Sequence, residues 1–152
     1  MKKLKQKTKE LSLDMFTMKI RFVVGTVEEN KKYVSNFLNK VTKIGENCTK
    51  ENYKQRREKI LNRIPLVKGT SIRRLKIGGD QSYILIFING DLVESERMLK
   101  KVLFHETRHA VDQIVTWRNF SFDDVEFTAE LQSWINIEFL DTVEEWWKEN
   151  KE

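Results

Sequence analysis

The chain has 152 residues, of which 39% are hydrophobic and 34% are charged, a composition typical of a folded domain rather than of a disordered segment. No apolar run approaches the roughly 20 residues that a membrane-spanning helix needs, and the first residues lack the apolar stretch of a secretory signal. We therefore expect no membrane contact and a cytoplasmic location. Cys48 is the only cysteine, which excludes an internal disulfide and a zinc site built from cysteines.

The first ten residues hold five lysines and one glutamate, and they contribute much of the net charge of +5. We interpret residues 1–18 as a solvated basic arm and residues 19–152 as a single domain. Such an arm could contact an acidic partner. No nucleic-acid-binding motif accompanies it, so nucleic acid is not an expected partner.

The next part of the chain predicts one strand and two helices. Residues 19–25 (KIRFVVG) are rich in β-branched and aromatic side chains, which favours a strand. Apolar residues then recur at helical spacing, which predicts an amphipathic helix over about 27–44. A second, more charged helix is predicted over 51–64, because Pro65 cannot continue it.

Two further strands are predicted before the character of the sequence changes. Residues 71–77 form a candidate strand, and the Gly-Gly-Asp sequence at 78–80 predicts a turn. Residues 83–88 (YILIFI) are six apolar residues in a row, which is typical of a strand covered on both faces. The polar sequence at 89–91 ends this strand.

Two long helices are predicted in the last third of the chain. Asp91 or Ser95 is a candidate cap for a helix that continues through Trp117. A polar break at 119–124 precedes a final helix over about 123–148. Strands and helices followed by two long helices predict an α+β domain.

The chain has only two histidines, His105 and His109, and a glutamate follows the first. Four residues make about one helical turn, a rise of ~6 Å, so both imidazoles leave the same face of a helix. Two neutral imidazoles at that spacing can bind one zinc ion, and Glu106 is placed to take a proton from a water that zinc has made acidic. The simpler interpretation is a pair of ordinary histidines on an amphipathic helix.

The residues around the pair argue against that simpler interpretation. They make the helix apolar nearly all round: Met98, Leu99, Val102, Leu103, Phe104, Ala110, Val111, Ile114 and Val115. Two histidines and an acid on a buried helix need partners, because unpaired buried polar groups are costly. The pattern therefore indicates a divalent metal site, with Zn²⁺ as the expected ion.

A site of this kind needs a third protein ligand. No other histidine is present, and Cys48 lies far upstream, so a carboxylate on the final helix is the natural choice. Glu126 follows His109 by 17 residues, enough for the chain to turn and return antiparallel. Asp123 and Glu126 also have the spacing of a helix cap with its reciprocal acid, which is the structural alternative.

Three other acids compete with Glu126 for this role: Glu130, Asp123 and Asp124. Glu130 lies one turn after Glu126 and could instead accept a hydrogen bond from the outer nitrogen of a histidine ligand, which would fix its tautomer. An ordinary solvent-exposed acid is the alternative for Glu130.

The sequence HETRHA at 105–110, followed by EFTAE at 126–130, resembles the zincin metallopeptidases, and within them the gluzincins. The metzincin extension is absent, because Asp112 and Val115 stand where that group has glycine and its third histidine. The sequence of residues 83–140 and the small size of the chain are also similar to those of small zincin-like proteins of bacteriophages and mobile elements.

This resemblance implies a single zincin-like domain in which a small mixed sheet packs against the HExxH helix and a long C-terminal helix. It implies a zinc metallopeptidase in which His105, His109 and Glu126 bind the metal and Glu106 is the general base for metal-activated water. The substrate would be a peptide or protein, held by main-chain hydrogen bonds to residues 83–88 or to a neighbouring strand.

One departure from the gluzincins leaves a second function open. No further histidine is present to stabilise the oxyanion, and Tyr83, Tyr53 and Arg108 are the candidates to replace it. The small size, the basic arm and the tryptophan-rich last helix suit a non-catalytic assembly protein that binds partner chains, located in the virion if a phage encodes it.

Overall fold

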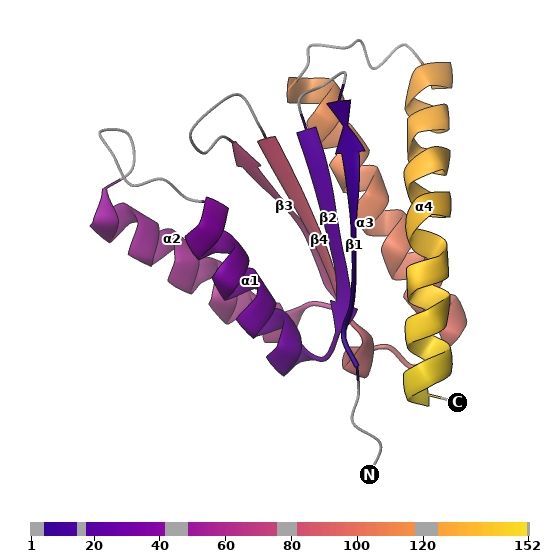
Figure 1. Cartoon of the computed structure of the whole chain (residues 1–152), viewed down its shortest axis with the longest axis horizontal. Helices are drawn as coiled ribbons and strands as arrows, with labels where there is room; N and C mark the ends of the chain where they lie inside the picture. Colours follow the sequence, from indigo (N-terminus) through magenta and orange to yellow (C-terminus); the bar gives the residue numbers. More distant parts are fainter. Residues whose placement is uncertain (1–4, 15–17, 42–48, 76–81, 118–124, 152) are drawn as a thin grey trace.

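A computed structural model gives the architecture of the chain (Figure 1). It describes the chain in five stretches: residues 5–14, 18–41, 49–75, 82–117 and 125–151, with the backbone alone for 41, 73–75 and 117. Cys48 and the predicted turns at 78–80 and 119–124 lie outside these stretches.

The described residues form an α+β fold around a four-stranded sheet in the order β1-β2-β4-β3. The strands are β1 (Lys7–Leu13), β2 (Met18–Gly25), β3 (Gly69–Leu75) and β4 (Ser82–Asn89). β2 and β4 pair in parallel at the centre, and β1 and β3 flank them antiparallel. The three strands predicted from residue 19 onward are confirmed.

The predicted boundary at residue 18 is wrong for β1, because seven residues of the supposed arm form this strand of the sheet. Leu11 and Leu13 are buried in the core. Lys7 and Lys9 point towards the last helix, where they form ion pairs with Glu149 at 2.9 Å and with Glu138 at 3.4 Å. These lysines pair with acids that follow them by 142 and 129 residues, and the local sequence does not reveal such pairing.

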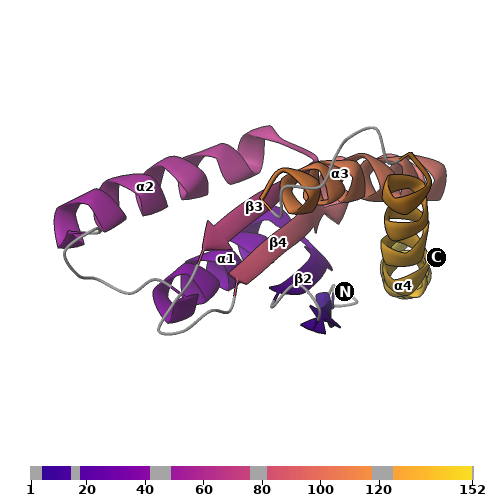
Figure 2. The same ribbon diagram turned by 90° about the horizontal axis from the view of Figure 1, so that it is seen from above.

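Helices cover both faces of the sheet (Figures 1 and 2). One face carries α1 (Val27–Val41) and α2 (Lys50–Arg63), and the other carries α3 (Glu96–Trp117) and α4 (Val125–Lys151). The four predicted helices are therefore confirmed within a few residues. None of the helices in the described stretches is long and apolar enough to cross a membrane.

The apolar run of β4 is explained by these two layers. Successive side chains of a strand point to opposite faces, so Ile84, Ile86 and Ile88 enter the core beneath α3 and α4, while Leu85 and Phe87 enter the core beneath α1 and α2. β4 is thereby fixed between two cores, as the sequence predicted.

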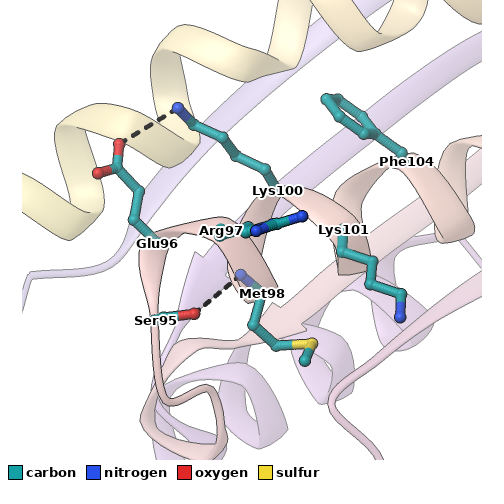
Figure 3. Close-up of a pocket in the computed structure, with 7 residues that line it drawn as sticks. All are labelled: Ser95, Glu96, Arg97, Met98, Lys100, Lys101 and Phe104. Atoms are coloured by element: carbon teal, nitrogen blue, oxygen red, sulfur yellow. Dashed lines mark hydrogen bonds and ion pairs between the residues drawn. The ribbon is translucent and has the colours of Figure 1, made fainter.

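The start of α3 is capped by Ser95, whose hydroxyl accepts a hydrogen bond from the N–H of Met98 at 3.1 Å (Figure 3). The other predicted cap, Asp91, instead accepts from the N–H of Val27 at the start of α1. From Ser95 onward α3 runs without interruption, and this continuity sets the spacing of the histidines along it.

Gly90 allows the end of β4 to pack directly against α4. A Cβ atom there would overlap the indole ring of Trp146, which is fully buried. We expect Gly90→Ala to lower the free energy of unfolding by about 1–3 kcal/mol, as overpacking of a core does. Thermal or urea unfolding measures this loss. In a Trp146→Leu background Gly90→Ala should cost less than in the wild type, because the indole ring that a Cβ would overlap is absent, and an unchanged melting temperature for Gly90→Ala alone would contradict the packing.

Candidate metal centre

The middle of α3 presents His105 and His109 outward and Glu106 inward. The side chain of His105 is 67% exposed, and His109 is also exposed, whereas Glu106 is only 7% exposed. The i, i+4 spacing therefore has the predicted effect, because both imidazoles lie on one accessible face of the helix.

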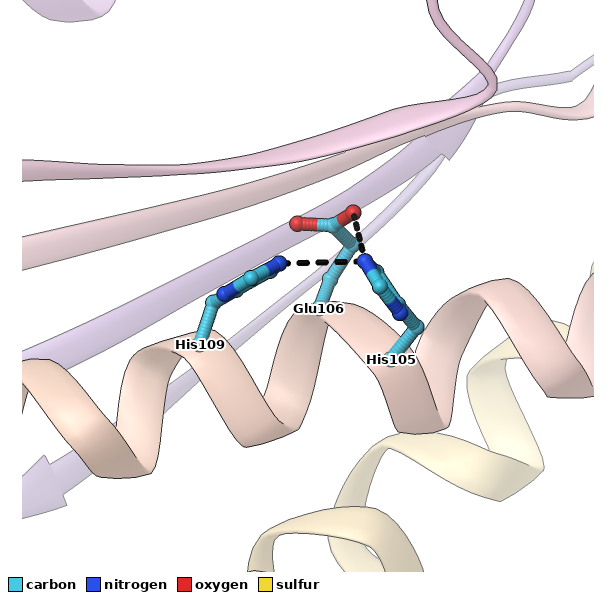
Figure 4. Close-up of side chains that lie close together, drawn as sticks. All are labelled: His105, Glu106 and His109. Atoms are coloured by element: carbon cyan, nitrogen blue, oxygen red, sulfur yellow. Dashed lines mark hydrogen bonds and ion pairs between the residues drawn. The ribbon is translucent and has the colours of Figure 1, made fainter.

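The three side chains converge on one point beside the helix (Figure 4). The Nε2 atoms of His105 and His109 are 3.0 Å apart, and the two rings are nearly perpendicular, at 85°. Oε1 of Glu106 lies 4.0 Å from Nε2 of His105. All three potential ligand atoms are within 4.8 Å of one another, so this group could hold a metal ion.

The separation of the histidine nitrogens fits a shared metal ion. Two nitrogens bound to one tetrahedral zinc at 2.0–2.1 Å lie about 3.3 Å apart, close to the 3.0 Å between the two Nε2 atoms. A direct N–H···N hydrogen bond would use the same atoms and require opposite tautomers. Two imidazoles with a nearby carboxylate are a donor set that suits a divalent transition metal.

Glu106 lies against β3 as well as beside the histidines. Burial raises the pKa of its carboxyl above the ordinary value, because the charged form loses water. The charges of His109 and His105 and a hydrogen bond from the backbone N–H of Ser71 lower this pKa in part. Glu106 thus holds its proton more tightly than an exposed glutamate does.

The raised pKa of Glu106 predicts a pH-dependent contribution to stability. Its pKa in the native state exceeds the value of 4.5 that it has when exposed. The native state therefore binds the proton more tightly than the unfolded state does, and the free energy of unfolding falls as the pH rises above about 4.5. In metal-free protein kept in chelator, we expect Glu106→Gln to raise the melting temperature at pH 7 and to lose this advantage near pH 4. A difference in melting temperature between the two proteins that grows towards pH 4 would contradict this prediction.

The structure does not bring the predicted third ligand, Glu126, to the histidines. Nη1 of Arg108 lies 3.5 Å from Oε1 of Gln132, which sets the alignment of α3 with α4. Glu126 precedes Gln132 by six residues, about 9 Å along the helix axis, and it is exposed in the first turn of α4. Among the described residues, the group within 4.8 Å holds His105, Glu106 and His109 but not Glu126. Its role as a ligand stays a prediction.

Glu130 is also outside the group formed by His105, Glu106 and His109. It lines a hollow between α4 and the end of β1, together with Ser12, Leu13, Asp14, Phe127, Leu131 and Trp134. None of these residues belongs to α3, so the structure gives no support to the predicted hydrogen bond from a histidine to Glu130. The other candidate acids, Asp123 and Asp124, lie outside the described residues.

A second hollow lies along the first half of α3 (Figure 3). It is lined by Ser95, Glu96, Arg97, Met98, Lys100, Lys101 and Phe104, and it includes none of the three metal-site residues. Its lysine at position 100 is engaged in ion pairs with Glu96 and with Glu144 of α4. We assign the candidate site to the histidine face of α3 rather than to this hollow, because the potential metal ligands His105, Glu106 and His109 come together there.

Two of the three candidates for stabilising an oxyanion lie on the face of the sheet opposite to α3, which carries the histidines. Tyr83 packs edge-on against Phe37, with ring centres 6.0 Å apart, and Tyr53 belongs to the same core beneath α1 and α2. Arg108 lies on α3, and its Nε atom is 3.2 Å from Asp112. The tyrosines are therefore excluded by their position, and Arg108 is engaged as an ion-pair partner.

Two residues of β3 near the site were not predicted from the sequence. Ser71 contacts Glu106 through its backbone, and a Cβ atom on Gly69 would lie 3.4 Å from Cγ of Glu106. The glycine at the start of a strand was the available signal, since such a residue often marks a close approach of another segment.

Comparisons of the chain with protein-family models, with curated proteins and with solved structures give no match. The assignment of the candidate site therefore rests on its residues and their geometry.

Proposed function

We propose that the protein is a zinc-dependent peptidase of zincin type. The observation that carries this proposal is the position of Glu106, a buried carboxylate 4.0 Å from a histidine nitrogen that itself lies 3.0 Å from a second one. A metal that served only to stabilise the fold would not require a carboxylate with a raised pKa beside an accessible pair of imidazoles.

In this proposal His105 and His109 hold the zinc ion, and Glu126 completes the ligand set if the start of α4 approaches α3. When bound, zinc would polarise the peptide carbonyl and acidify a water molecule. Glu106 takes the proton from the attacking water and returns it to the leaving amine, so one carboxylate acts first as base and then as acid.

The proposed substrate is an extended peptide beside β3. β4 has sheet partners on both sides, which use its main-chain groups, whereas β3 is the last strand of the described sheet. α3 packs against β3 (Figure 2), so a peptide added to that edge would lie next to the helix that carries the histidine pair. Main-chain hydrogen bonds to β3, other than to the N–H of Ser71 from which Glu106 accepts, would hold such a peptide with little regard to its sequence.

The direct test is turnover by zinc-loaded protein. Unfolded casein or a peptide library should be cleaved, a chelator should stop the cleavage, and added zinc should restore it. Cleavage that survives prolonged chelation would assign the activity to something other than this site. No cleavage of any substrate by protein that holds one zinc per chain would remove the enzymatic proposal.

The second candidate function is a non-catalytic assembly protein. The observation in its favour is that α4 exposes Val125, Trp134 and Ile137, which are 69%, 40% and 66% exposed. Exposed apolar residues of this size are typical of surfaces that bind other proteins. This candidate predicts a stable complex with partner chains and metal without turnover. A lone monomer that cleaves peptides would contradict it.

A further inference from the structure

β3 has an open side whose backbone groups can be assigned residue by residue. The N–H of Asn89 donates to the carbonyl of Lys68 at 2.8 Å, so the backbone groups of Lys68 face β4. Backbone direction alternates along an antiparallel strand, and β3 pairs with β4 in register from Gly69 to Leu75. Thr70 and Ile72 therefore also face β4, whereas Gly69, Ser71 and Arg73 direct their backbone groups to the open side.

α3 packs over the face of the sheet to which positions 69 and 71 direct their side chains, next to this open side. Val102, Glu106 and Gln113 project from α3: a Cβ on Gly69 would meet Val102 at 2.8 Å, and Nε2 of Gln113 lies 3.5 Å from Oγ of Ser71. The N–H of Ser71, which points away from β4, donates to the carboxylate of Glu106. An amide that would otherwise be left open at a sheet edge is thus used by the carboxylate of the candidate metal site.

We propose that the open-side amide of Ser71 is the group that positions Glu106 beside the histidine pair, and that Gly69 is required because it lets α3 come close enough for this contact. This proposal rests on the proposed function, and it identifies the group that holds the general base, Glu106, in place. A glutamate side chain has three rotatable bonds, and a single fixed donor removes much of that freedom.

Gly69 is essential to this arrangement for a steric reason. A methyl group there would lie 2.8 Å from Cγ1 of Val102 and 3.0 Å from the carbonyl oxygen of Phe87. The carbonyl belongs to the sheet and cannot yield, so Val102 and the helix that carries it must move away from β3. Such a shift lengthens the distance from Ser71 to Glu106 and leaves the base less well positioned.

Amide hydrogen exchange tests the contact without any need for turnover. In the wild-type protein the amide of Ser71 should exchange at least about 10-fold more slowly than that of Arg73, which also points to the open side and to which the described residues offer no such acceptor. Glu106→Ala should accelerate exchange at Ser71 by about the same factor and leave Arg73 unchanged. The matched control is Val102→Ala, on the same side of α3 one turn earlier, which should leave Ser71 protected. Equal exchange at Ser71 and Arg73 in the wild-type protein would overturn the proposal.

Kinetics then test the role of the contact. Gly69→Ala should lower kcat by about 10-fold or more with little change in KM or in zinc affinity, since the two histidines shift together with the helix and only the contact between Ser71 and Glu106 is lost. In a Glu106→Gln background Gly69→Ala should have no further effect on residual activity, because the two changes act through one group. Additive losses would assign Gly69 a purely structural role. If the wild-type protein has no activity, the exchange experiment still decides whether Ser71 holds Glu106.

Discussion

Glu106→Gln is expected to reduce peptide cleavage by at least about 100-fold, and by up to about 10,000-fold, while zinc stays bound. A positioned general base contributes a factor of this size, and glutamine keeps the shape of the side chain but cannot accept the proton from water. Each factor of ten corresponds to about 1.4 kcal/mol in the activation barrier. Steady-state rates on one fluorogenic peptide, with zinc content measured on the same samples, give the comparison.

The matched control for this substitution is Glu130→Gln, the same chemical change at an exposed acid that lines the hollow near β1. It should leave cleavage within a factor of about two. Equal rates for wild type and Glu106→Gln would end the assignment of Glu106 as base. A variant that loses zinc together with activity would instead identify Glu106 as a metal ligand.

His109→Ala is expected to abolish stoichiometric zinc binding. The two Nε2 atoms are 3.0 Å apart, and removal of either leaves one imidazole, which cannot hold zinc against water or a competing chelator. Loss of an outer partner of a ligand already costs 10–100-fold in metal affinity, so we expect the loss of a ligand to exceed about 100-fold. Competition with a chromophoric chelator and metal analysis of purified protein measure the change.

Thermal stability provides an independent readout of the same substitution. Zinc should raise the melting temperature of the wild-type protein, since a ligand at 100 times its Kd stabilises the native state by about 2.7 kcal/mol. Zinc should leave the melting temperature of His109→Ala unchanged. Arg108→Ala is the neighbouring control and should retain the response to zinc. An undiminished response in His109→Ala would place the metal elsewhere.

Glu126→Ala decides the third ligand in the same assay. In the structure Glu126 is exposed and outside the His105, Glu106 and His109 group. A loss of affinity comparable with that of His109→Ala would mean that zinc draws the start of α4 towards α3. Unchanged affinity would mean that Glu126 is an ordinary acid of the first turn, where its charge favours the helix dipole.

The sequence alone determined the features that depend on neighbours along the chain. The spacing of His105 and His109 placed both imidazoles on one helix face, because an α-helix turns once in 3.6 residues. The unbroken apolar run at 83–88 predicted a strand between two cores, and the alternation of Ile86 and Phe87 between those cores is the reason. Helix and strand boundaries followed from similarly local signals.

Only the tertiary structure decided which distant segments meet. The lysines at positions 7 and 9 belong to an edge strand because β1 pairs with β2 and buries Leu11 and Leu13, and acids of α4 then lie beside these lysines. Asn89, predicted only as part of the polar sequence that ends a strand, is fully buried and donates to the carbonyls of Ile64 and Val67. These contacts depend on the order of the strands and on how helices pack across them, which no periodicity along the chain encodes.

The same division applies within the candidate site. The sequence supplied the two histidines and the adjacent glutamate, since one helix turn is enough to bring them together. It could not show that Ser71 faces Glu106, nor that Gln132 of α4, six residues after Glu126, lies beside Arg108 of α3. Those contacts are set by the packing of α3 against β3 and α4, where side chains far apart in sequence share one close-packed space.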